Sequence, residues 1–138
     1  MTSSLENLSK PGGALIREPP DERELAGLKR SGLARLKDAR NTSLEIESRF
    51  DLVYNAAHAL CLAALRSKGF RAQHRYIVFQ VVPHTLELGP EVWRVLDKGH
   101  HQRNLAEYEG VLDIEERLIQ DMIEACDAVV ARLEAMEI

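Results

Sequence analysis

The stretch "YNAAHALCLAAL", residues 54–65, is the part of the sequence that decides the fold class. Its larger apolar residues recur at the spacing of one helical face, and most positions between them are alanine. Alanine is the strongest helix former, and its small side chain lets a neighbouring backbone come close. The pattern extends on both sides, so we predict a central helix over about residues 43–67, which Gly69 ends. The face that it buries consists of Phe50, Val53, Tyr54, Ala57, Cys61, Ala64 and Leu65.

A second amphipathic helix is predicted before this one, from about Asp21 to Arg40. Four apolar residues at helical spacing form its stripe: Leu25, Leu28, Leu36 and Ala39. The segment "NTSLE" then breaks the pattern. Within it, Thr42 and Glu45 have the spacing of a capping box, which predicts the start of the central helix.

Three further helices are predicted after the central one. The run "RYIVFQVV" is apolar all round and could form a strand, but no second strand is expected to pair with it. We therefore predict a short buried helix over about residues 74–87, which Pro83 bends or ends. The next helix has Pro90 in its first turn and is released at Gly110. The last helix opens near Asp113 and Glu116 and runs to about residue 137.

The chain is thus predicted to be an all-α antiparallel bundle of about five helices. Residues 21–138 form the domain, and residues 1–20, which end in Pro19-Pro20, form a flexible N-terminal arm. No apolar run approaches the roughly 20 residues that span a bilayer, so no membrane association is expected and the location is expected to be cytoplasmic. Cys61 and Cys126 fit small apolar residues in a reducing compartment.

Charge is unevenly distributed along the chain. The net charge is −4, yet residues 66–75 contain four basic residues and no acid, whereas residues 107–137 are strongly acidic. The basic residues are Arg66, Lys68, Arg71 and Arg75. This asymmetry suggests an anionic ligand on one side of the protein. The alternative is that both segments form solvated helix faces.

Arg103, in the stretch "GHHQRNLAEYEG", lies on the stripe of its helix that should point inward. A guanidinium is charged at any reachable pH and is costly to bury alone. It therefore needs either an acidic partner, as in a buried salt bridge, or a cleft open to water. In a cleft, its planar fork would suit the oxygens of a phosphate.

Four neighbours of Arg103 are candidates for the same site: Asn104, Tyr108, His100 and His101. Adjacent histidines on a helix point about 100° apart, and the sequence has no histidine or cysteine pair at zinc spacing. We therefore expect no metal site and no cofactor. His58, among the alanines of the central helix, fits a core or interface histidine.

Three motifs, in this order, resemble the HEPN superfamily of small prokaryotic helical bundles, and most closely its small standalone members. They are "YNAAHALCLAAL" from Tyr54, "GFRAQH" from Gly69 and "RNLAEYEG" from Arg103, and the resemblance covers about residues 21–137. Active members of that superfamily are metal-independent RNases whose motif is an arginine, a polar residue and a later histidine. Arg103 and Asn104 match its start, whereas Tyr108 stands in the histidine slot.

The resemblance implies a homodimer in which two such motifs face one cleft, and a partner such as an antitoxin or a nucleotidyltransferase. Since tyrosine has a pKa near 10, it fits proton transfer at neutral pH poorly. We therefore expect a module that binds RNA or a nucleotide through Arg103, Asn104 and Tyr108 without cutting, within a toxin–antitoxin or nucleotidyltransferase-linked system. One alternative is a divergent metal-independent RNase toxin that uses Tyr108, His100 or His101. Another is a structural, partner-binding helical dimer.

Overall fold

A computed structural model describes residues 3–110 and 113–138. These residues form seven helices and two strands of three residues each, so the all-α prediction is confirmed, with two more helices than expected. The elements are α1 Ser3–Leu8, β1 Leu15–Arg17, α2 Glu22–Ala39, α3 Ile46–Ser67, β2 Phe70–Ala72, α4 Arg75–Gln80, α5 Val82–Thr85, α6 Pro90–Glu109 and α7 Glu116–Ala135.

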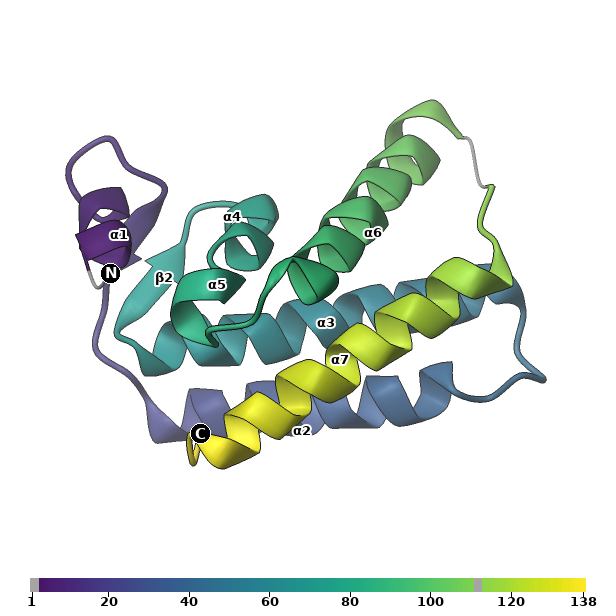
Figure 1. The fold of residues 1–138 in the computed structure, drawn as a ribbon, viewed down its shortest axis with the longest axis horizontal. Helices are drawn as coiled ribbons and strands as arrows, with labels where there is room; N and C mark the ends of the chain where they lie inside the picture. Colours follow the sequence, from purple (N-terminus) through teal and green to yellow (C-terminus); the bar gives the residue numbers. More distant parts are fainter. Residues whose placement is uncertain (1–2, 111–112) are drawn as a thin grey trace.

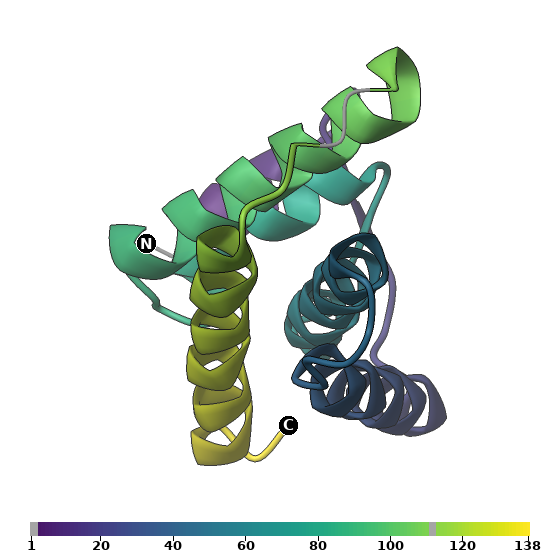
Figure 2. The same cartoon turned by 90° about the vertical axis from the view of Figure 1, so that its right-hand side faces the viewer.

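The alanine-rich helix α3 is the centre of the fold, as its sequence predicts. It packs against α2 along its length, is crossed by α7, and carries β2, α4 and α5 on its remaining side. In the end-on view of Figure 2, α2 and α3 lie together on one side, while α7 stands opposite with α6 above it. The close approach of α2 and α3 occurs at Gly32, where an added Cβ would lie 2.7 Å from Leu60 Cγ.

The start of α3 differs from the prediction. The helix begins at Ile46, and its N-cap residue Glu45 makes no side-chain capping bond, so the capping box of Thr42 and Glu45 is wrong. The reason is local: the side-chain oxygen of Asn41 accepts hydrogen bonds from the backbone N–H and the hydroxyl of Ser43, at 3.0 and 2.7 Å. This turn competes with helix formation over the same residues.

The N-terminal arm contains one short helix and one strand. It forms α1 and β1, and β1 pairs antiparallel with β2, a pairing that was not predicted. Neither strand includes the run "RYIVFQVV". Leu5 and Leu15 insert into the core, where only 8% and 2% of their surface remains exposed. Figure 1 shows α1 beside β2 at one end of the molecule. Strands of three residues give little periodic signal, which explains why they were not predicted.

The apolar run after β2 is helical, as predicted, but it forms two short helices. The break lies at Val81, and Pro83 is in the first turn of α5, where its missing N–H has no helical acceptor to lose. Pro83 therefore begins a helix rather than ending one. Among the described residues no helix has the length and apolarity required to cross a membrane.

Candidate functional site

Side chains from α3, α4 and α6 converge on Tyr54, a tyrosine of α3 that is only 1% exposed. Its hydroxyl lies 3.0 Å from Nδ1 of His100 on α6. Nε2 of the same imidazole lies 3.3 Å from the side-chain nitrogen of Asn104, one turn further along α6. The ring also stacks on Tyr76 of α4, with the centroids 5.0 Å apart. Both nitrogens of His100 are therefore held, which fixes the orientation of the ring.

Two arginines from different helices lie on the ring of this same tyrosine. The guanidinium carbon of Arg103 on α6 is 4.9 Å from the Tyr54 centroid, and that of Arg75 on α4 is 5.9 Å from it. Arg103 pairs with Glu107 at 3.1 Å and keeps 28% of its side chain exposed. Arg75 donates a bond of 3.3 Å to the neutral amide oxygen of Asn55, and no acid of residues 3–110 or 113–138 pairs with it.

The two histidines nearest these arginines are held in the neutral form. The pKa of His58 is lowered to about 4, first by burial and then by the positive charges of Arg75 and Arg103. The pKa of His100 is also lowered, by burial and then by His101 and Arg103. Burial raises the pKa of Tyr54, although the two arginines act in the opposite direction. We call the group of Tyr54, His58, Arg75, His100, Arg103 and Asn104 the Tyr54 cluster. It is a half-buried polar site with a positive potential, and its two histidines and its tyrosine are uncharged at pH 7.

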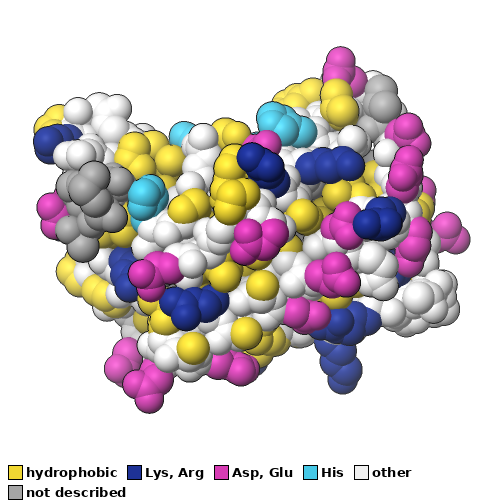
Figure 3. Space-filling model, in the orientation of Figure 1, with side chains coloured by type: hydrophobic (Ala, Val, Ile, Leu, Met, Phe, Trp, Pro, Cys, Tyr) yellow, Lys and Arg dark blue, Asp and Glu magenta, His cyan; other side chains and the backbone are white. Residues whose placement is uncertain are grey.

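Arg103 also borders a hollow of about 460 Å³. That hollow is lined by Glu47, Asp51 and Glu107, three acids for one arginine. Coulomb repulsion makes it unsuitable for an anion. An anion would therefore be favoured near the Tyr54 ring, where Arg103 and Arg75 both lie. Figure 3 shows basic and histidine side chains along α6 at the top of the view.

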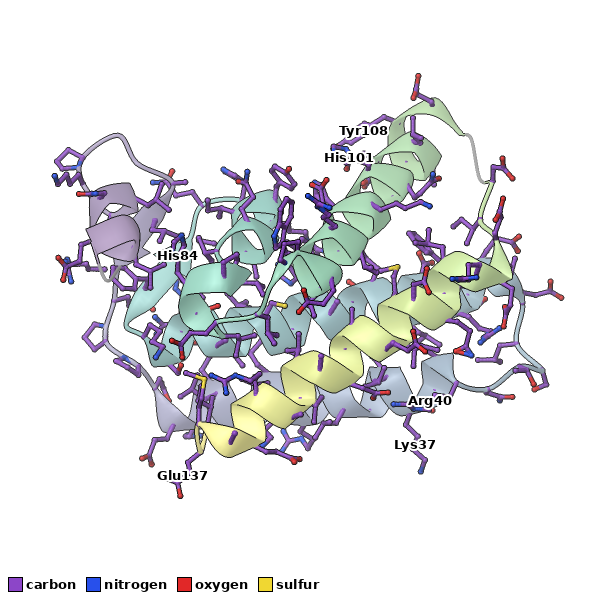
Figure 4. The ribbon with its side chains drawn as sticks, in the orientation of Figure 1. Lys37, Arg40, His84, His101, Tyr108 and Glu137 are labelled. Carbon is purple, nitrogen blue, oxygen red and sulfur yellow. The ribbon has the colours of Figure 1, made fainter. Side chains whose placement is uncertain are left out.

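The structure brings three of the predicted site residues together: His100, Arg103 and Asn104, which are spaced to share one face of α6. His101 and Tyr108 occupy a different face and are largely exposed, with Tyr108 at 79%. Figure 4 shows both on the same edge of α6. Five residues correspond to about 500° of helical rotation, so Tyr108 points well away from Arg103.

Sequence reasoning missed Tyr54 and Arg75 as parts of this site. Neither lies in the motif around Arg103, and only the packing of α3 and α4 against α6 brings them to it. A weak signal existed for a third residue, Asp97, which precedes His100 and His101 by three and four residues and so shares their side of the helix. Asp97 accepts a hydrogen bond of 2.6 Å from the Tyr76 hydroxyl and lies 3.5 Å from His101.

The basic run at residues 66–75 is largely neutralised in the fold. Arg66, which is 1% exposed, pairs with Glu24 at 2.6 Å, and Arg71 pairs with both Glu18 and Glu24 at 2.7 Å. These contacts lower the pKa values of Glu18 and Glu24, through the hydrogen bonds from Arg71 above all. Of the three arginines in this run, only Arg75 faces the Tyr54 cluster without an acid of the described chain beside it.

Within the described ranges, no group of three histidine, cysteine, aspartate or glutamate side chains is placed to hold a metal ion. Cys61 and Cys126 are free and fully buried, as small apolar residues would be. No protein-family model, curated protein or solved structure matches the chain.

Proposed function

We propose that the chain binds RNA or a nucleotide by holding a phosphate between Arg75 and Arg103, with Asn104 beside it. One observation carries the proposal: two guanidinium groups from two helices lie on the ring of one buried tyrosine, and only Arg103 has an acidic partner among the described residues. The two guanidinium carbons lie 4.9 and 5.9 Å from one ring centroid, so both positive charges attract an anion to the same part of the surface.

The chemistry of the neighbours favours a phosphate over a simple carboxylate. Arginine presents a planar set of N–H donors that fits two oxygens of a phosphate, and two arginines can contact more of its oxygens than one. The amide of Asn104 lies on the same face of α6 and can donate to a further oxygen. The aromatic rings of Tyr76 and Phe79 flank His100, which suits a ligand that carries bases.

Membership of the HEPN superfamily, which the motifs of α3 and α6 suggest, is part of the same proposal. It explains why the ligand would be RNA and why an antitoxin or nucleotidyltransferase partner is expected. A homodimer is also part of the proposal. His101, Leu105 and Tyr108 form an exposed edge of α6, with Leu105 at 37% and Tyr108 at 79%, and this edge is the surface that we assign to a second copy or a partner.

The test is the binding of a fluorescently labelled single-stranded RNA, followed by anisotropy at fixed salt. Arg103→Ala and Arg75→Ala should each weaken binding by roughly tenfold or more, because a charged hydrogen bond to phosphate is removed. The matched control is Arg117→Ala on α7, since Arg117 also makes an ion pair four residues along its helix, with Asp121 at 3.3 Å. Equal binding by all four proteins, each with an unchanged melting curve, would rule the proposal out.

A second candidate function, a metal-independent RNase, is favoured by the position of His100. Its lowered pKa leaves the ring neutral at pH 7, and it lies beside Arg103 on the same helical face. Nε2 could accept a proton once a substrate hydroxyl displaces the 3.3 Å contact with Asn104. In this reaction the 2′-oxygen of RNA bonds to phosphorus, His100 takes its proton, and the bond to the 5′-oxygen breaks as water protonates that oxygen. The place of His100 before Arg103 in sequence is no obstacle, because residues three apart are neighbours on a helix.

Cleavage of a mixed pool of labelled RNA in EDTA decides between the two functions. Cutting by the wild type, but not by His100→Ala or Arg103→Ala, would establish the RNase. If no protein cuts while the wild type still binds RNA in a manner that depends on Arg103, the binding function stands alone.

A further inference from the structure

An aromatic hollow lies directly beside the Tyr54 cluster, between α4, α5 and α6. Its volume is about 280 Å³, and its lining residues are Tyr76, Phe79, Gln80, Pro83, Trp93 and Asp97. Sites for drug-sized ligands occupy about 300–1,000 Å³, so this one suits a single flat ring system rather than a whole nucleotide. Two of its walls, Tyr76 and Phe79, also contact His100, so the hollow and the cluster share side chains.

The hollow contains one acid, Asp97, and only one of its two carboxylate oxygens has a partner in the described part of the chain. Tyr76 and His101 both approach the same oxygen, Oδ1, at 2.6 and 3.5 Å. The other oxygen, Oδ2, accepts no hydrogen bond from residues 3–110 or 113–138. Every fully buried side-chain oxygen or nitrogen of the described residues has a hydrogen-bond partner. Because Oδ2 has none, it is not fully buried, and a ligand can reach it from solvent. A ligand that covers this oxygen must donate a hydrogen bond to it, and the aromatic walls favour a flat ring. The hollow therefore suits a flat ligand that carries N–H donors.

We propose that this hollow is a subsite for a guanine base, stacked beside Trp93 and Tyr76 and donating its N–H groups to Asp97. The inference rests on the proposed function, since the phosphate of the same ligand would lie on Arg75 and Arg103. It deepens that function by naming the base: the protein would prefer RNA or nucleotides in which a guanine lies next to the bound phosphate.

The choice of guanine follows from the arrangement of donors on the bases. Guanine presents two adjacent N–H donors, at N1 and at its exocyclic amine, which match the two oxygens of a carboxylate. Adenine and cytosine place a ring acceptor beside their amine, and uracil places a carbonyl on each side of its N–H, so each would set an oxygen or a lone pair against Asp97. At Oδ1, the contact with the exposed His101 is long for a hydrogen bond and is the one that guanine would displace.

Trp93 makes the test direct, because it is the only tryptophan in the chain. Titration with guanosine 5′-monophosphate should quench its fluorescence, and inosine 5′-monophosphate, which lacks only the exocyclic amine, should bind roughly tenfold more weakly. Asp97→Asn should remove this preference. Asp121→Asn on α7 is the matched control, with 36% of its side chain exposed against 30% for Asp97. Equal binding of the two nucleotides by the wild type would overturn the inference.

Asp97→Asn could disturb packing by weakening the bond from Tyr76, so a second variant, Tyr76→Phe, removes that bond and keeps the ring. It should retain the preference for guanine. Guanosine, which has no phosphate, separates the two proposals. If guanosine and its monophosphate leave Trp93 unchanged while RNA binding still requires Arg103, the guanine subsite is wrong and the phosphate site stands. If guanosine binds in a manner that depends on Asp97 while RNA binding ignores Arg75 and Arg103, the proposed function is wrong and the subsite stands.

Discussion

Two pairs of arginines in this protein have opposite surroundings. Arg66 and Arg71, at the end of α3 and in β2, are held by carboxylates and backbone oxygens. Arg66 alone donates to Glu24 at 2.6 Å and to the carbonyl oxygens of Glu18 and Pro19 at 2.9 and 2.8 Å. Arg75 and Arg103 lie on an aromatic ring, and among the described residues only Arg103 has an acidic partner, Glu107.

The charge of an arginine in the sequence therefore says little about its role, whereas the acceptors around it in the fold say much. A guanidinium whose donors are all used by the protein ties segments together, here the linker before α2 to the end of α3. One whose donors remain open next to a like charge is poised for an external anion.

Arg66→Ala should give the largest loss of stability, about 3–5 kcal/mol, because Glu24 would lose its buried partner and the linker carbonyls their donor. Urea unfolding followed by circular dichroism measures it. Arg66→Lys should recover only part of the loss, since a lysine lacks the planar fork that reaches several acceptors. A loss below about 1 kcal/mol, the usual range of surface ion pairs, would place Arg66 with the weakly coupled arginines and remove the contrast.

Arg75 and Arg103 should behave in the reverse manner, with little effect on stability and a clear one on RNA affinity. In the double variant, the slope of log K against log salt should become shallower by about 0.7 for each phosphate that the protein no longer neutralises. The unfolding free energy should change by about 1 kcal/mol or less, because both side chains are partly exposed. An unchanged salt slope together with a large stability loss would make this pair structural as well.

The fold could be predicted well where the burial of one helical face repeats over many residues. The helices α2, α3, α6 and α7 appear within a few residues of their predicted bounds, because apolar spacing and the glycines at 69 and 110 specify them. The strands β1 and β2 could not be predicted, since three residues carry no period and the pairing depends on a linker that Arg66 holds.

The site was predictable only in the part that lies on one helix. His100, Arg103 and Asn104 share a face by spacing alone, and the same arithmetic places Tyr108 elsewhere. Tyr54 and Arg75 come from helices that are distant in sequence, so nothing before folding links them to Arg103. The inward position expected for Arg103 also needed correction, because 28% of its side chain remains exposed.

The carboxylates of the first pair should make stability depend on acid pH. The pKa values of Glu18 and Glu24 are lowered in the folded protein, by the hydrogen bonds from Arg71 first. Their contribution is therefore present above the ordinary value of 4.5 and disappears as the pH falls through the lowered values. Unfolding curves of the wild type and Glu24→Gln should consequently converge below pH 4.5. A stability difference that stays constant down to acid unfolding would contradict the assignment.

The smallest effect concerns His58, whose pKa responds to the positive charges of Arg75 and Arg103. In the free protein its pKa is lowered to about 4, by burial and then by Arg75 and Arg103. An anion held by these arginines would cancel part of their field, so the pKa of His58 should rise when inorganic phosphate or a nucleotide binds. An NMR titration of the histidine ring protons measures the rise, with His84 on α5 as the internal reference. In Arg75→Ala the rise should be present before any ligand is added, because one of the two positive charges is absent. If phosphate leaves the pKa of His58 unchanged while RNA still binds, the anion lies outside the field of Arg75 and Arg103, and the two arginine pairs differ in burial rather than in function.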